Sequence, residues 1–134
     1  LTYLTTNLMP GDIVTELRFP VVSGRTGSAF TELSRRHGDF GLVTAACQVE
    51  LNDDDTVKDI RLALGAVDPV PYRATSAEEF LKSKKLTEKV IDEAMELIKE
   101  EIYPETDIHA TAEYKKEMAG VYTKKAILQA LERI

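Results

Sequence analysis

The spacing of apolar residues changes along the chain, and this change constrains the fold more than any other feature of the sequence. Before about residue 70, apolar and polar residues tend to alternate, which is the period of a β-strand with one buried face. Alternating or β-prone runs occur at Ile13–Phe19, Ala29–Leu33, Cys47–Leu51 and Ile60–Leu64. The polar segment Asn52–Asp55 joins the last two runs, so we predict that they form an antiparallel hairpin.

After about residue 70, apolar residues recur at three- and four-residue steps, which is the period of a helix. Ser76–Glu79 has the spacing of a capping box and predicts a short helix that ends near Leu81. A second helix is predicted from Thr87 until Pro104 ends it, with an apolar stripe of Val90, Ala94, Leu97, Ile98 and Ile102. A third is predicted from Thr111 to Arg133, with a stripe of Tyr114, Met118, Val121, Tyr122, Leu128 and Leu131.

Strands followed by helices, in separate blocks, predict an α+β fold. We expect an antiparallel sheet of three to four strands, because the connections between the early strands are too short for parallel crossovers, with three helices packed on one face. The 134 residues are expected to form one domain. It divides into a lead-in (1–12), a sheet half with a loop at Gly24–Gly27 (13–66), an extended connector (67–75) and a helical half (76–134).

Charge and composition exclude several classes of function. The net charge of −6 disfavours attraction to nucleic acid or anionic lipid. The longest nearly apolar stretch, Phe40–Cys47, is far too short to span a membrane. Cys47 is the only cysteine, which excludes an internal disulfide and favours a reducing compartment such as the cytoplasm. The first residue is Leu1 and not Met, which suggests part of a larger polypeptide.

A search for reactive motifs finds no self-contained active site. His37 and His109 lie in different halves without a metal-binding spacing, and both are expected in loops or at the surface. Cys47 is expected to be a buried structural thiol, and Asp53–Asp55 a turn. The glycines form no phosphate-binding pattern. Ser34–Gly41 stands out as a charged connection between β-prone runs, and it is either a solvated turn or a loop that presents groups to a ligand.

Four segments, in order, carry a resemblance to a known family: Gly11–Pro20, Ser28–Ala46, Leu64–Ala74 and Thr106–Lys116. They resemble the C-terminal domain of the flavoprotein (medium) subunit in molybdenum hydroxylases of the carbon monoxide dehydrogenase and xanthine dehydrogenase type. The resemblance covers nearly the whole chain. It implies an α+β arrangement of an antiparallel sheet with three helices, in agreement with the pattern of the residues.

The resemblance implies a role in electron transfer, as part of an oxidoreductase. It implies FAD, whose phosphates belong to an N-terminal FAD-binding domain of the same subunit, and a molybdenum cofactor and 2Fe-2S clusters on partner subunits. This domain is then one wall near the isoalloxazine ring. By position, flavin contacts fall on Val14 and Thr31, with Asp39 and Phe40 in a loop close to the flavin. The xanthine dehydrogenase branch has lysine where Thr31 stands, which puts NAD as the acceptor in doubt.

Two other classes of function remain open. The chain could be a docking module of the same kind of complex, which binds the iron–sulfur or molybdenum subunits and takes no part in flavin chemistry. It could also be a free-standing enzyme, but that requires a pocket with convergent titratable groups, for which the sequence offers no candidate.

Overall fold

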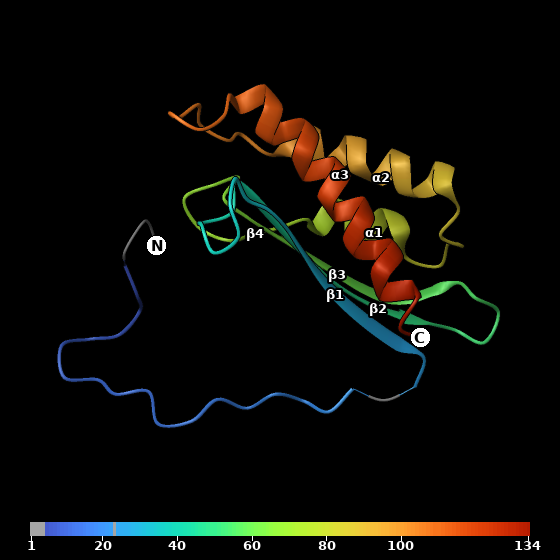
Figure 1. Cartoon of the computed structure of the whole chain (residues 1–134). Coiled ribbons are helices and arrows are strands. Elements are labelled where there is room, and N and C mark those ends of the chain that lie inside the picture. Colours follow the sequence, from blue (N-terminus) through green and yellow to red (C-terminus); the bar gives the residue numbers. More distant parts are fainter. Residues whose placement is uncertain (1–4, 23) are drawn as a thin grey trace.

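The computed structural model describes residues 5–22 and 24–134 and has two layers, a four-stranded antiparallel sheet and three helices on one of its faces (Figure 1). This arrangement confirms the predicted α+β class. The sheet order is β1-β2-β3-β4, and the elements are β1 (Thr26–Leu33), β2 (Val43–Leu51), β3 (Val57–Gly65), β4 (Tyr72–Arg73), α1 (Thr75–Leu81), α2 (Glu88–Glu101) and α3 (Ala112–Leu131). Among the described residues, no helix is long and apolar enough to cross a membrane.

The predicted alternation sets which face of the sheet is buried. Cys47 in β2 lies opposite Ala29 in β1 and Leu62 in β3, and all three side chains are buried beneath the helices. The predicted hairpin is confirmed, with Asn52 at its turn accepting from Asp55 N at 3.1 Å and donating to Thr56 O at 2.8 Å. Burial also raises the pKa of the Cys47 thiol to about 12, so the thiol stays protonated as expected of a structural cysteine.

Two runs of the first half differ from their predictions. Ile13–Phe19 is not a strand, because no strand lies beside it among the described residues, and Ile13 and Phe19 are both 82% exposed. The connector 67–75 is not wholly extended, since Tyr72 and Arg73 form β4 against Leu64 and Ala63. Because Ile13–Phe19 is not a strand, Gly24–Gly27 is not a loop between two strands but leads into β1. Its last two residues belong to that strand.

The predicted starts of the second and third helices are confirmed, and that of the first is not. Thr87 and Thr111 are the N-caps of α2 and α3, and their side chains accept hydrogen bonds from Val90 N and Tyr114 N. The capping box at Ser76–Glu79 is wrong: α1 begins one residue earlier, at Thr75, and no side chain caps it. Its other end, at Leu81, is as predicted.

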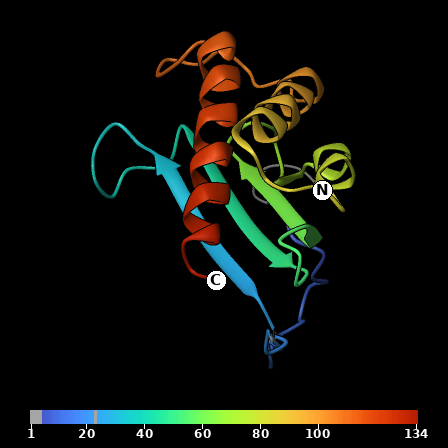
Figure 2. The ribbon, with the colours of Figure 1, turned by 90° about the vertical axis from the view of Figure 1, so that its right-hand side faces the viewer.

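The buried side of α3 is only partly the one predicted. Of the predicted stripe, Met118, Tyr122 and Leu131 pack against the core, whereas Tyr114, Val121 and Leu128 are more than 40% exposed. The buried residues are mostly small: Lys115, Ala119, Gly120, Thr123, Ala126, Ile127 and Ala130. The physical reason is that α3 lies across β1 and β2 and also beside α2 (Figure 2), so its contact face needs small side chains for close approach.

Strand β4 has only two residues, so it leaves the N–H of Leu62 in β3 without a strand partner. Glu78 of α1 takes the place of that partner. Its carboxylate is almost fully buried and accepts a hydrogen bond from Leu62 N at 2.8 Å and from Arg73 Nε at 2.9 Å. Removing the carboxylate leaves the Leu62 N–H buried without an acceptor. We therefore expect Glu78→Ala to lower the free energy of unfolding by about 2–3 kcal/mol. The exposed neighbour Glu79→Ala is the control, and urea unfolding that gave equal losses for both would contradict this role.

Gly27 in β1 and Gly120 in α3 give a matched pair of glycine substitutions, because only Gly27 lies at a very close approach. A Cβ on Gly27 would stand 1.9 Å from the Ala130 carbonyl oxygen, whereas one on Gly120 would meet Lys99 Cδ and Met95 Cβ at the ordinary distances of 3.5 and 3.6 Å. Gly27→Ala should therefore destabilise the fold by about 1–3 kcal/mol through overpacking. Gly120→Ala should leave stability unchanged or raise it by up to about 1 kcal/mol. Thermal unfolding of the two variants distinguishes the outcomes, and a stable Gly27→Ala protein would refute the close approach.

Candidate functional site

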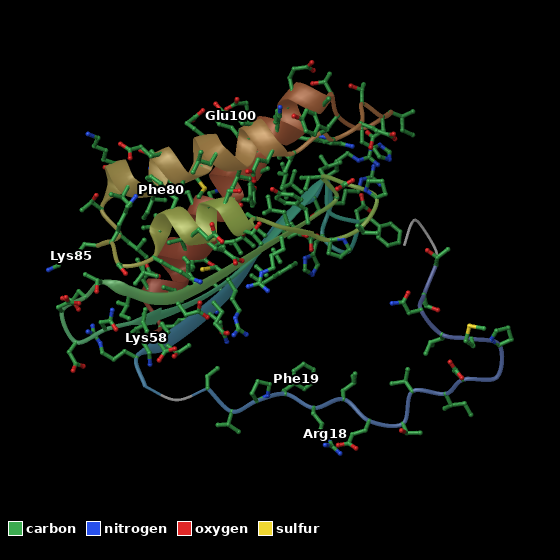
Figure 3. The ribbon with its side chains drawn as sticks, turned by 180° about the vertical axis from the view of Figure 1, so that it is seen from behind. Arg18, Phe19, Lys58, Phe80, Lys85 and Glu100 are labelled. Atoms are coloured by element: carbon green, nitrogen blue, oxygen red, sulfur yellow. The ribbon has the colours of Figure 1, made fainter. Side chains whose placement is uncertain are left out.

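In the part of the chain that the structure describes, the face of the sheet away from the helices is uncovered (Figure 3). This face holds a shallow hollow lined by residues of all four strands. Phe30, Ala46, Ala63 and Arg73 stand side by side across the four strands. The two alanines form a low floor, and Phe30, which is 59% exposed, stands at one side of it. The hollow has a volume of about 610 Å³, and we refer to it as the open-face hollow.

Three arginines border the open-face hollow, and each is held by a partner. Arg73 pairs with Glu78, and Arg61 lies 3.3 Å from Asp59 Oδ2. Arg133, which follows α3, donates from Nη1 to Ser28 O at 2.7 Å. Hydrogen bonding by Glu78 raises the pKa of Arg73 above its ordinary value. The hollow therefore combines a flat apolar floor with guanidinium groups at its border, two of which are paired with carboxylates.

The four residues predicted to contact a flavin do not meet in one place. Asp39 and Phe40 lie together in the exposed loop between β1 and β2, and Phe40 is fully exposed. Val14 lies in the extended segment before β1 and is 59% exposed. Thr31 is buried on the helix side of β1, where its hydroxyl donates to Tyr122 O of α3 at 2.8 Å. Thr31 therefore faces away from the open-face hollow.

The β1–β2 loop borders a second, smaller hollow that brings distant parts of the chain together. Its volume is about 260 Å³, and its lining residues are Arg35, Gly38, Asp39, Phe40, Leu42 and His109. His109 comes from the loop before α3, far away in sequence. Both histidines are exposed, as predicted from the sequence. The charged segment Ser34–Gly41 is an exposed loop whose Gly38 has a φ of +89°, a conformation that glycine adopts at little cost.

A buried lysine holds the loop that carries His109. Lys115 Nζ donates to Glu105 O at 2.9 Å and to Asp107 Oδ2 at 2.7 Å. The other Asp107 oxygen accepts from the N–H groups of His109 at 2.7 Å and Ala110 at 3.0 Å. These hydrogen bonds, with that from Lys115 the strongest, hold the pKa of Asp107 well below its usual range.

Sequence reasoning missed the open-face hollow and the lysine that holds the His109 loop. A signal for the first was present, because alternation that buries Ala29 and Thr31 must place Phe30 on the other face. The other exposed positions of these strands carry mostly small or polar residues, so an aromatic side chain among them is unusual. No comparable signal existed for Lys115, because a lysine on a helix is ordinarily exposed.

The Asp107 contact predicts a specific response to pH. Because the folded pKa is lowered, the ionised carboxylate stabilises the fold above the ordinary aspartate pKa of about 4, and this stabilisation is lost as pH falls through the lowered pKa. We expect the amide resonances of His109 and Ala110 to titrate below pH ~4 in the native protein. In Lys115→Met the midpoint should rise toward the ordinary value, whereas Lys116→Met should leave it in place. An NMR titration with one midpoint for all three proteins would contradict the contact.

Comparisons with known proteins agree with this architecture. The family profile of the CO dehydrogenase flavoprotein C-terminal domain matches residues 28–130. The chain is 32% identical to the carbon monoxide dehydrogenase medium chain of Hydrogenophaga pseudoflava, over 98% of this chain and 45% of that protein. It is 30% identical to the glyceraldehyde dehydrogenase medium chain of Sulfolobus acidocaldarius, over 91% of this chain and 43% of that protein.

A solved structure agrees over nearly the whole chain. The carbon monoxide dehydrogenase of Hydrogenophaga pseudoflava, in a form that lacks the Mo-pyranopterin moiety of the molybdenum cofactor, superposes with a TM-score of 0.93. That match covers 99% of this chain and 46% of the solved one, at 32% identity. The chain thus spans less than half the length of the relatives it matches. The chain belongs to the CO dehydrogenase flavoprotein C-terminal domain family.

Proposed function

We propose that this chain is the C-terminal domain of the flavoprotein subunit in an oxidoreductase of the molybdenum hydroxylase type. In this role it forms one wall of the FAD isoalloxazine site, where electrons pass from iron–sulfur clusters to an acceptor. The family match and the similarity to medium chains support the proposal. The FAD phosphates belong to a flavin-binding portion outside these residues, and the molybdenum cofactor and 2Fe-2S clusters to partner subunits. We place the complex in the cytoplasm.

The observation that carries the proposal is the open-face hollow. A planar aromatic ring fits against a sheet face whose floor is two alanines, because no bulky side chain stands in its way. Phe30 can contact such a ring directly, by an offset or edge-on arrangement. The bordering arginines supply positive charge near a ring that becomes electron-rich when reduced. The residues present therefore fit the isoalloxazine group.

The other predicted residues take roles that follow from their places. We propose that Asp39 and Phe40 approach the flavin from the β1–β2 loop, and Val14 from the segment before β1. Thr31 acts as a positioning residue, because its hydroxyl is hydrogen-bonded to α3 and joins the sheet to the helix layer. The bound flavin supplies the electron transfer itself. This chain excludes water from one side of the ring and sets the dipoles and charges around it.

Phe30 and Thr31 are adjacent in β1 but lie on opposite faces of the sheet, so they provide a matched test of the flavin wall. In the intact flavoprotein, Phe30→Ala should shift the flavin reduction potential by tens of millivolts, since the ring loses an apolar neighbour and gains water. Thr31→Val removes the hydrogen bond to Tyr122 O, so it should lower the unfolding temperature and leave the potential near that of the native protein. Redox titration followed by flavin absorbance gives the potential. An unchanged potential in Phe30→Ala would rule out the open-face wall.

The competing function is a docking module, and substitutions in the intact flavoprotein distinguish it from our proposal. If this domain only holds subunits together, Phe30→Ala and Asp39→Asn change the yield of assembled complex and leave the potential of the assembled fraction unchanged. If the domain forms the flavin wall, the potential moves in complexes that assemble normally. Size-exclusion chromatography before the redox titration provides the assembled fraction.

A further inference from the structure

Lys115 of α3 is buried, unlike every other lysine in the part of the chain that the structure describes. Taking an ammonium group out of water costs free energy, and a buried ion pair is often no better for stability than apolar residues of similar volume. Burial of this lysine is therefore weak evidence for a role in stability. The part of the chain that its hydrogen bonds fix is a better guide to its role.

Lys115 fixes the loop between α2 and α3, residues 102–111, which we refer to as the α2–α3 loop. Its Nζ donates to Asp107 Oδ2 at 2.7 Å, and Asp107 Oδ1 accepts from the N–H groups of His109 and Ala110. The loop is closed by a further hydrogen bond, from Asp107 N to Ala110 O at 3.1 Å. Asp107 thus connects the backbone of His109 to a side chain of α3.

The helix that carries Lys115 is itself held close to the sheet. Gly27 of β1 has no room for a Cβ beside the Ala130 carbonyl oxygen, and Thr31 of β1 donates to Tyr122 O at 2.8 Å. Because α3 cannot shift without losing these contacts, Lys115 fixes the α2–α3 loop relative to the sheet. The position of His109 is therefore defined relative to β1.

His109 contributes to the surface against which the β1–β2 loop lies. Both loops are at the same end of the molecule (Figures 1 and 2). The hollow of about 260 Å³ between them is lined by Asp39 and Phe40 from one loop and by His109 from the other. Of its lining residues, His109 is the only one that does not come from the β1–β2 connection. The side chain of His109 is thus the link between the two loops.

The β1–β2 loop has few bonds of its own. Among the described residues, the only hydrogen bond of residues 35–40 is that from Asp39 N to Arg36 O at 3.1 Å, and none of their side chains forms an ion pair. A loop with so little internal bonding takes its position from the surface beside it. The α2–α3 loop, which Lys115 fixes, provides that surface through His109.

We infer that Lys115 is a positioning residue, which acts through Asp107 and His109 to set the place of the β1–β2 loop and of the Asp39 and Phe40 side chains beside the flavin. This inference rests on the proposed function, which assigns Asp39 and Phe40 to the flavin. Groups that approach a ligand need a supporting layer whose own side chains are locked by packing and hydrogen bonds. Lys115 and Asp107 have the features of such a layer, since one is buried and both are hydrogen-bonded.

The test is ¹⁵N relaxation by NMR on the intact flavoprotein, which reports the order of each backbone amide. In Lys115→Met the order parameters of residues 106–110 and also of residues 38–40 should fall from about 0.85, typical of rigid backbone, to below about 0.6. In His109→Ala the link between the loops is lost but Asp107 keeps its partners. Only residues 38–40 should then become mobile.

Two controls separate positioning from a general loss of stability. Lys116→Met removes a neighbouring lysine that is not buried and should leave both loops ordered. Gly27→Ala strains the far end of β1 and should also leave them ordered. Mobility confined to residues 106–110 in Lys115→Met would make the lysine a structural residue only and would overturn the inference. His109→Ala keeps the buried lysine, so it tests the link even if Lys115→Met does not fold.

Visible circular dichroism of the bound flavin gives a second measurement, because it responds to the groups around the ring. Lys115→Met and His109→Ala should shift the flavin bands, whereas Lys116→Met should leave them in place. A mobile β1–β2 loop with unchanged flavin bands overturns the inference, because the loop then does not stand beside the flavin.

Failure of this inference can be distinguished from failure of the proposed flavin wall. A β1–β2 loop that stays ordered in Lys115→Met, in a subunit whose flavin potential responds to Phe30→Ala, refutes positioning by Lys115 and leaves the wall standing. A loop that becomes mobile and shifts the flavin bands, in a subunit whose potential does not respond to Phe30→Ala, supports positioning by Lys115 and refutes the wall.

Discussion

The close packing of α3 against β1 and β2 determines most of what this fold can do. The helix lies so near the sheet that Gly27 has no room for a Cβ beside Ala130, and its contact face is built largely from alanine, glycine and threonine. Such small side chains bring backbones together and gain many dispersion contacts at short range. With α1 and α2 on the same side, all the helices cover one face of the sheet.

When helices cover only one face of a sheet, the other face must meet either water or a partner. In most antiparallel sheets the open face is polar and meets water. Here its centre consists of Phe30 beside Ala46 and Ala63, with guanidinium groups around them. This is a surface that accepts a flat partner. The one-sided placement of the helices thus leaves uncovered the face to which we assign the flavin wall.

The fold could be predicted from the sequence wherever one local pattern decides the structure. Alternation placed Cys47, Ile60, Leu62 and Leu64 on the buried face, and helical spacing placed the starts of two helices at Thr87 and Thr111, which are their N-caps. Prediction failed where a distant partner decides. Ile13–Phe19 has a strand pattern but no neighbouring strand among the described residues, and the contact face of α3 follows from a close approach that favours alanine over leucine. Of the site residues, Asp39 and Phe40 were found together in one loop, and their contact with flavin stays a prediction.

Position matters more than reactivity in such a domain. The open-face hollow has no histidine or carboxylate in its lining to act as a general base, and its one cysteine, Cys47, is buried and protonated. A flavin needs neither from this side, because the energy of its reduced state responds to nearby charge, dipoles and water. Of the arginines bordering the open-face hollow, Arg73 and Arg133 are held by hydrogen bonds to Glu78 and to the Ser28 carbonyl, so these charges do not have to be ordered when the ring changes its own. Preorganised charge of this kind is effective because little reorganisation accompanies electron transfer. The empty motif search and the proposed electron-transfer role therefore have the same physical explanation.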